Sequence, residues 1–441
     1  MVFIEGFNFS VIVELLFGTE GDGFVNLHSL ILIIGMMIIV HISNEAGVFQ
    51  FIAGKLIKLS GANPIKLMVI FCSVTVLISA ILNNILAVII LIPLTITVSR
   101  ILNINPSPYI LTQAVLVNVG GTVFSISSIP NILITTFAGI EFLEFFINVG
   151  LVSLVIFILT TMFFVLIYHK ELAISEESAK ILDEFNVWNV VQNKKLLYKS
   201  SIVLIVLFTL FLFIPSSLLT PDIIALSLAL ILIIISRLDE KEIISNIDFE
   251  LIFYLLGIFI IAGGLELTGV TEAIGFGLLS IGNVSFYVQM LLVLWFSAYL
   301  SSAIDNIPIT KVLIPSIGKM AESLPVSERN SLFYSLAFGA NWGDNLTPLG
   351  DNILVVNLAQ KNNRLISFKQ FFKLGFITSN YQLAILSIYF TFLDNIFNGI
   401  ILLTISLGSI LIITLLTKKG PIKIRNKLIK VIDKIRIFII R

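Results

Sequence analysis

The chain carries the same short polar motif twice, and both copies interrupt strongly apolar sequence. Residues 79–93 read SAILNNILAVIILIP and residues 301–315 read SSAIDNIPITKVLIP, so that Asn84 and Asn306 lie 222 positions apart. A break of this kind leaves backbone groups that lipid cannot satisfy, and at membrane depth it must line a cavity enclosed by protein. A duplicated pair of broken helices predicts a transport site where two repeats meet.

The composition indicates a polytopic membrane protein. Apolar residues make up 57% of the chain and charged residues 12%, with a mean hydropathy of +1.06. These values exclude an ordinary soluble globular chain. Long charge-free stretches recur along the sequence, and a span needs about 20 apolar residues, so we expect an all-α protein with about ten to twelve spans or half-spans. The single cysteine, Cys72, excludes an intrachain disulfide and a cysteine-based metal site.

The repeat extends beyond the opening motif. HISNEAGV at 41–48 has a counterpart in GGLELTGV at 263–270, and GGTVFSISSIPNI at 120–132 has one in GDNLTPLGDNI at 343–353. Each half therefore contains a span that ends in an acid-and-glycine turn, a broken helix, and a second polar break. We expect re-entrant hairpins at these breaks.

The distribution of lysines predicts that the two halves have opposite orientations. The loop at 44–66 contains three lysines, whereas its counterpart at 266–288 contains none. Cytoplasmic loops are enriched in Lys and Arg, so these loops should lie on opposite faces of the membrane. The sequence thus predicts an inverted-topology repeat in a multi-pass protein of the cell (cytoplasmic) membrane, with the N-terminus outside and the C-terminus cytoplasmic.

The same features divide the chain into five regions. They are an N-terminal arm (1–24), a first transport repeat (25–168), a linker region with two spans (169–250), a second transport repeat with the final spans (251–417) and a basic cytoplasmic tail (418–441). The tail holds nine basic residues and one aspartate, and we interpret it as resting on lipid headgroups, because nothing indicates a nucleic-acid site.

The duplicated breaks supply the candidate binding residues. Unwound carbonyls and side-chain oxygens can replace the hydration shell of a small ion, and carboxylates within spans are functional candidates because burying them is costly. The candidate residues are Asn83, Asn84, Gly120, Gly121, Thr122, Ser125, Pro130, Asn131, Asp305, Asn306, Asn341, Asp344, Asn345, Thr347, Asp351 and Asn352. The three aspartates are candidate sodium ligands, and no resident cofactor is expected. For Asn83, a structural role that bridges helices stays open.

Lys311 is an unusual residue for its position. It follows Asp305 by six residues, inside an apolar segment that runs to Pro315. We expect it to couple ion binding to movement by pairing with an aspartate when the site is empty and releasing it when a cation binds.

These motifs resemble the ion transporter superfamily and its citrate-transporter-like domain, in the branch of arsenite permeases, NhaD-type sodium/proton antiporters and the pigmentation P protein. The resemblance covers roughly residues 25–415 and rests chiefly on the segments 303–315 and 339–353. It implies paired hairpins, a homodimer and secondary active transport by movement of one part of the protein against the rest. The stretch from Ser127 to Asn131 departs from the related pattern Gly-Asp-Pro-Pro-Asn, which puts a first-half carboxylate contact in doubt.

The predicted function is a sodium(cation)/proton antiporter. A fixed carboxylate at Asp305 would repel an anionic substrate, so a cation is favoured. Arsenite or oxyanion efflux and di- or tricarboxylate symport stay open as alternatives, and an ion channel is less favoured because nothing indicates a continuous pore. An enzyme is not expected, since motifs such as His-Glu-x-x-His are absent. The expected partners are membrane lipids and a small ion.

Overall fold

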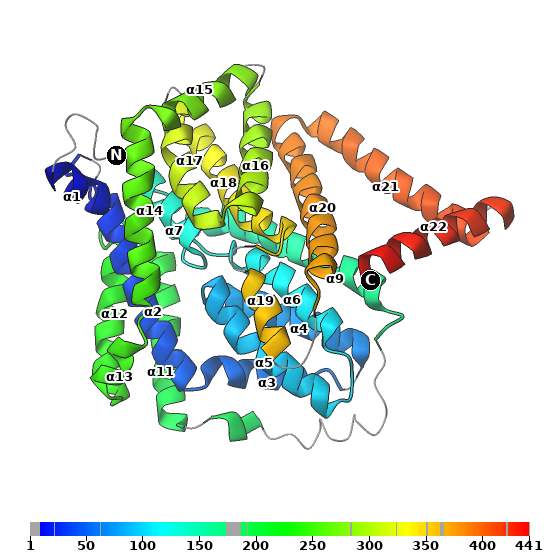
Figure 1. The fold of residues 1–441 in the computed structure, drawn as a ribbon, viewed down its shortest axis with the longest axis horizontal. Coiled ribbons are helices and arrows are strands. Elements are labelled where there is room, and N and C mark those ends of the chain that lie inside the picture. The colour runs from blue at the N-terminus through cyan, green and yellow to red at the C-terminus, as the bar shows by residue number, and fades with distance from the viewer. Residues whose placement is uncertain are drawn as a thin grey trace.

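The computed structural model describes residues 9–21, 23–61, 63–172, 187–191, 193–282, 285–322, 324–349, 352–361, 366–419 and 422–440. Within these ranges the regular elements are helices (Figure 1). Seven of them are long and apolar enough to cross a membrane, and four more apolar helices are shorter. These described helices agree with the predicted all-α membrane protein of ten to twelve spans or half-spans.

Two series of helices follow the same order. The first comprises α2 (Val25–Glu45), α3 (Val48–Lys58), α4 (Pro64–Ser79), α5 (Asn84–Ile101), α6 (Ser107–Gly120), α7 (Ile129–Ala138), α8 (Phe142–Phe145), the π-helical turn η1 (Phe146–Gly150) and α9 (Leu151–Tyr168). The second comprises α14 (Phe249–Leu267), α15 (Val270–Gly282), α16 (Phe286–Ala303), α17 (Asn306–Met320), α18 (Val326–Gly343), the 3₁₀ turn η3 (Asp344–Leu346), α19 (Asn352–Lys361) and α20 (Phe368–Asp394). The helices α3, α4 and α5 each start 222 residues before α15, α16 and α17.

The other described elements precede, join and follow these series. They are α1 (Phe9–Phe17), the 3₁₀ turn η2 (Val187–Val190), α11 (Lys194–Phe213), α12 (Pro221–Ser236), α13 (Glu240–Ser245), α21 (Ile396–Lys419) and α22 (Ile422–Ile440). The structure does not test where the five predicted regions begin and end, and that division stays a prediction.

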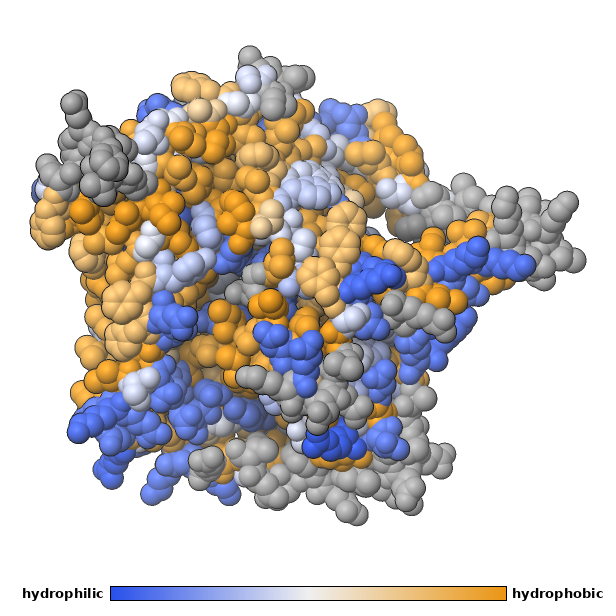
Figure 2. All heavy atoms as spheres, in the orientation of Figure 1, coloured by the Kyte–Doolittle hydropathy of each residue, from blue (hydrophilic) through white to orange (hydrophobic). Residues whose placement is uncertain are grey.

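The two series are inverted relative to each other. Figure 1 shows α3 along the lower edge of the molecule and its counterpart α15 along the upper edge. Exposed Lys55 and Lys58 lie on α3, whereas α15 carries the exposed Glu272. Apolar residues cover much of the face in Figure 2, and hydrophilic residues gather at its lower edge over α13 and the start of α11. The inverted repeat predicted from loop charges is confirmed.

Polar side chains start the helices at the breaks. Asn83 accepts a hydrogen bond from the Leu86 N–H (2.9 Å) and caps α5, and Ser128 caps α7 by accepting one from Asn131. Asp305 caps α17 through the Asn306 N–H (2.7 Å). Such caps satisfy N–H groups that have no partner within the helix, which lets these helices start inside the membrane.

Small residues allow the helices around these breaks to pack closely. A Cβ added at Gly343 would lie 2.2 Å from the Ala298 carbonyl oxygen, and one at Gly339 would lie 2.4 Å from that of Leu294, so α18 rests directly on the backbone of α16. At Gly35 an added Cβ would lie 2.8 Å from the Leu226 backbone nitrogen, which brings α2 against α12. Close backbone approach of this kind is typical of packing between membrane helices.

Candidate functional site

A small cavity lies where the broken helices of the two repeats meet. It has a volume of about 20 Å³, which is room for about one water-sized particle. Its lining residues are Asn83, Asn84, Ile85, Ser128, Ile129, Pro130, Asn306 and Ile307. We call it the central cavity. Four predicted site residues are therefore brought together: Asn83, Asn84, Pro130 and Asn306.

Three helices begin at the central cavity. The first residues of α5, α7 and α17 are Asn84, Ile129 and Asn306, and all three line it. The N-terminus of a helix carries a partial positive charge and free N–H groups, so these ends orient electron-rich atoms of ligands and side chains toward themselves.

Buried amides link the cavity to a carboxylate of the second repeat. Asn84 Nδ2 donates to Asn118 Oδ1, and Asn118 Nδ2 donates to Asn345 Oδ1 (2.8 Å) and Asp344 Oδ2 (3.2 Å). Asn352 Nδ2 also donates to Asp344 Oδ2 (2.9 Å). The five residues therefore form one continuous network across the repeat interface, which we call the amide network.

Asp344 is the charged member of this network. Its side chain belongs to a residue that is 2% exposed, and two neutral amides donate to one of its oxygens. A carboxylate removed from water is costly unless a proton or a cation offsets its charge. Asp344 is thus chemically suited to exchange one for the other.

A second group of contacts joins the repeats next to the amide network. Asn341 Nδ2 donates to Asn131 Oδ1 (2.9 Å), and Trp342 Nε1 donates to Thr122 Oγ1 (3.1 Å). Asn131 in turn donates to the Gly121 carbonyl oxygen (2.8 Å), which holds the unwound stretch after α6 in place. The buried Asn341 Oδ1 has no hydrogen-bond partner among the described residues and is an available oxygen ligand.

Asp305 has a different environment from Asp344. Its φ of 151° and ψ of 154° lie in a region that is nearly restricted to glycine, where a side chain costs about 1–3 kcal/mol of backbone strain. Its Oδ2 accepts a hydrogen bond from Tyr254 OH on α14 (3.0 Å). The Asp305 carboxylate, which precedes the first residue of α17, therefore faces α14.

The remaining predicted residues lie around these groups. Gly120 and Gly121 pack against Ser79 and the Asn84 Oδ1 atom, where an added Cβ would lie 2.8 Å and 2.6 Å from its neighbour. Thr347 donates to the Ser302 carbonyl oxygen (2.7 Å), and Ser125 lines a separate cavity.

Asp351 lies outside the described residues. The described part of the chain contains no cluster of three or more His, Cys, Asp or Glu side chains for a metal. Because Asp351 lies outside it, the sodium site formed by the three aspartates stays a prediction.

Lys311 contacts the helices outside the central cavity. Its Nζ donates to Asn26 Oδ1 on α2, and it lies 4.9 Å from the ring centroid of Phe259 on α14. Lys311 thus joins α17 to both of these long helices. The predicted pairing with an aspartate stays a prediction.

Sequence reasoning missed Asn118, which connects Asn84 to Asp344 and Asn345. It lies within α6, where a single asparagine suggested no break. A signal was nevertheless present, because Asn118-Val119-Gly120 matches Asn341-Trp342-Gly343 in the second half. Extending the repeat alignment two residues upstream of Gly120 identifies it.

The chain is similar in sequence to proteins that are named as membrane proteins or transporters. The chain is 28% identical over 361 residues to the 46 kDa membrane protein of Mycobacterium leprae, covering 81% of this chain and 84% of that protein. An uncharacterized transporter of Mycobacterium tuberculosis is 29% identical over 365 residues, with the same coverage. The P protein of Homo sapiens is 26% identical, covering 80% of this chain and 52% of that protein, so the chain spans about half of its length.

The fold also resembles a solved structure. The Alcanivorax borkumensis YdaH transporter, whose crystal structure revealed an unusual topology, matches with a TM-score of 0.61 over 91% of this chain and 88% of that one, at 15% identity. The sequence family described as "Citrate transporter" matches residues 1–339. Together with the inverted broken helices, this match shows that the chain is a membrane transporter of the citrate transporter family.

Proposed function

We propose that this transporter exchanges sodium for protons, with Na⁺ and H⁺ competing for the Asp344 carboxylate. The observation that carries the proposal is the position of that carboxylate, which is buried among amides of both repeats and connected to a water-sized cavity. A hard cation such as sodium prefers oxygen ligands, and the amide network supplies several when its side chains rotate. A proton on Asp344 removes the charge that attracts the cation.

Carboxylate symport is the second candidate, favoured by the family match and by the three helix N-termini at the central cavity. Helix N-termini suit an anionic substrate. Two observations favour the cation. The cavity, at about 20 Å³, has room for about one water-sized particle, which is far smaller than a tricarboxylate. Two carboxylates, Asp305 and Asp344, also occupy the tips from which an anion would be repelled.

The test is flux in proteoliposomes that contain a pH-sensitive dye, with sodium, lithium, potassium, arsenite and citrate added in turn to an imposed proton gradient. Sodium is expected to give a proton signal in the wild type. In Asp344→Asn, whose amide oxygen can still accept from Asn118 and Asn352, the signal is expected to fall at least about tenfold, or about 1.4 kcal/mol. The matched control is Asp433→Asn, the same chemical change at a partly exposed residue of α22 whose carboxylate lies 3.4 Å from Lys170 Nζ. Silence with sodium and a response to citrate or arsenite would contradict the proposal.

The orientation and assembly belong to the same proposal. We place the α3 face in the cytoplasm of a cell-membrane protein because it carries Lys55 and Lys58. The homodimer rests on family resemblance and is tested by the mass of the purified particle.

A further inference from the structure

Four cavities of the structure form a series in which each one shares lining residues with the next. The first, which we call the vestibule, has a volume of about 780 Å³. The second, third and fourth have volumes of about 210, 30 and 20 Å³, and the fourth is the central cavity. The cavity volumes therefore decrease toward the site.

Each junction is defined by named residues. The vestibule and the second cavity share Val25, Thr136 and Gly139. The second and third cavities share Ile126, and the third and the central cavity share Asn83, Ser128 and Ile129. Ile126, which is 5% exposed, is the apolar side chain at the junction where the cavity volume falls by the largest factor, from about 210 to about 30 Å³.

The vestibule lies at the α15 face of the molecule. Thr271 and Glu272 of α15 line it, together with residues from the end of α17 such as Lys319. This is the face opposite α3 in Figure 1, and it is the face that the proposed orientation places outside the cell.

Charges along the wide part of the series favour a cation. Glu266, Glu272 and Glu322 line the vestibule with Lys319 and Arg329, and Lys319 Nζ lies 4.0 Å from Glu272 and 3.9 Å from Glu322. The second cavity adds Asp222, and the lining of the two cavities then has four carboxylates against two permanent cations. A cleft with an excess of one sign of charge concentrates ions of the opposite sign.

The second cavity also contains the polar pair His28 and Asp222. His28 Nδ1 lies 2.8 Å from Asp222 Oδ2, and the side chains are 38% and 5% exposed. Ser125, Thr135 and Thr220 add hydroxyl groups to the same lining, which also contains apolar side chains such as Leu32, Ile140 and Phe142.

We propose that these four cavities are the route by which a cation passes from the α15 face to the central cavity, hydrated as far as the constriction at Ile126 and without its full hydration shell in the two small cavities beyond it. The identity of the cation rests on the proposed function. The route itself rests on the shared lining residues and the excess of carboxylates.

The experiment measures how fast membrane-impermeant thiol reagents modify variants that each carry one introduced cysteine. Cys72 is buried and gives a low background. Thr136→Cys reports on the vestibule, and Ser125→Cys and Ile126→Cys report on the route beyond it. Glu272→Cys marks the α15 face and Lys58→Cys marks the α3 face, since both native side chains are exposed.

Thr136→Cys and Ser125→Cys are expected to react from the side that labels Glu272→Cys, with Ile126→Cys slower. For each variant we compare the rate with a cationic reagent to the rate with an anionic reagent. This ratio of rates is expected to be about tenfold higher at Ser125→Cys than at Lys58→Cys. The route is overturned if Ser125→Cys and Ile126→Cys do not react from this side, or if the anionic reagent reacts faster than the cationic one at Ser125→Cys. Either result overturns it even if sodium/proton exchange is intact. Expected labelling in a protein without sodium/proton exchange supports the route and overturns the proposed function. Ser125→Cys is a one-atom change, so this arm does not depend on a disruptive variant.

Discussion

At the scale of residues, the site consists of amides that donate and accept at the same time. Asn118 shows this best, since its oxygen accepts from Asn84 and its nitrogen donates to Asp344 and Asn345. The duplicated motifs predicted most of these partners from sequence. The different partners of Asp305 and Asp344 could not be predicted, because they depend on a strained backbone angle at Asp305 and on contacts between segments far apart in the chain.

Replacing Asn118 should therefore damage both stability and transport. In Asn118→Ala, buried groups of Asn84 and Asn345 lose a partner, and each unsatisfied group costs about 1–3 kcal/mol. We expect a lower unfolding temperature in detergent and an at least tenfold loss of ion flux. The control is Asn148→Ala, which removes an exposed amide that donates to the Glu144 carbonyl oxygen (2.9 Å). If the two variants had equal unfolding temperatures and equal ion flux, the amide network would contribute little to stability or to transport.

At the scale of elements, the positions of helices follow from sequence, whereas their local irregularities follow from packing. The broken helices start at the predicted motifs with caps at Asn83 and Asp305. The π-helical turn between α8 and α9 was not predicted. Gly150 at its end lies so close to the loop after α6 that an added Cβ would be 2.3 Å from the Val123 carbonyl oxygen. Sequence shows the glycine but not the backbone that it meets.

The contact between α16 and α18 gives a prediction at this scale. Gly343→Ala would place a Cβ 2.2 Å from the Ala298 carbonyl oxygen, so α18 must move and the turn that carries Asp344 must move with it. Overpacking of this kind costs about 1–3 kcal/mol. We expect a lower unfolding temperature and a loss of flux. Gly257→Ala on α14 is the matched control, because an added Cβ there meets nothing within 4 Å. Its unfolding temperature should stay at or above that of the wild type.

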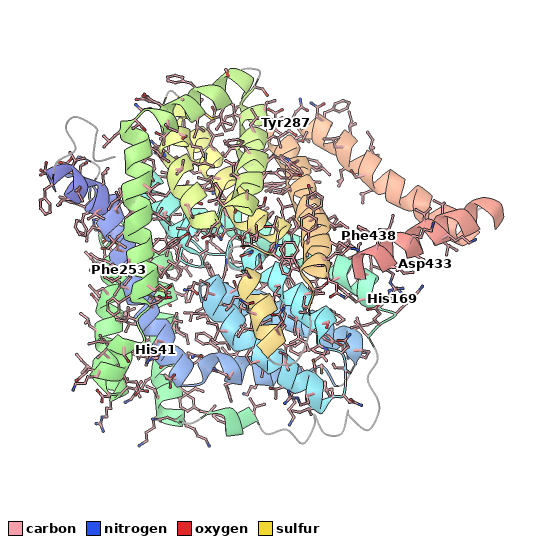
Figure 3. The ribbon with its side chains drawn as sticks, viewed as in Figure 1. His41, His169, Phe253, Tyr287, Asp433 and Phe438 are labelled. Atoms are coloured by element: carbon pink, nitrogen blue, oxygen red, sulfur yellow. The ribbon has the colours of Figure 1, made fainter. Side chains whose placement is uncertain are left out.

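At the scale of the whole molecule, the two inverted series place basic α3 and acidic α15 on opposite faces. The C-terminal helix α22 docks beside the ends of α9 and α20. Arg436 Nε donates to the Ile167 carbonyl oxygen (2.7 Å), and Lys373 Nζ lies 4.0 Å from the Phe438 ring centroid. Figure 3 shows Asp433 and Phe438 on this helix near His169 at the end of α9. The lipid contact predicted for the tail stays a prediction.

The proposed orientation is checked with the two exposed marker positions. In intact cells, an impermeant thiol reagent should modify Glu272→Cys and spare Lys58→Cys, because the positive charges of α3 favour the cytoplasm. In inside-out vesicles the pattern should reverse. Modification of Lys58→Cys in intact cells would place the basic face outside and contradict the orientation.

The most direct test of the central claim is the number of protons released when sodium binds to the purified protein in weakly buffered detergent. A carboxylate accepts sodium only in its deprotonated form, so a fall in pH weakens sodium binding and each Na⁺ bound releases up to one H⁺. We predict release from the wild type and from Asp433→Asn, and none from Asp344→Asn. Sodium binding without proton release in the wild type, or unchanged release in Asp344→Asn, would contradict exchange at this carboxylate.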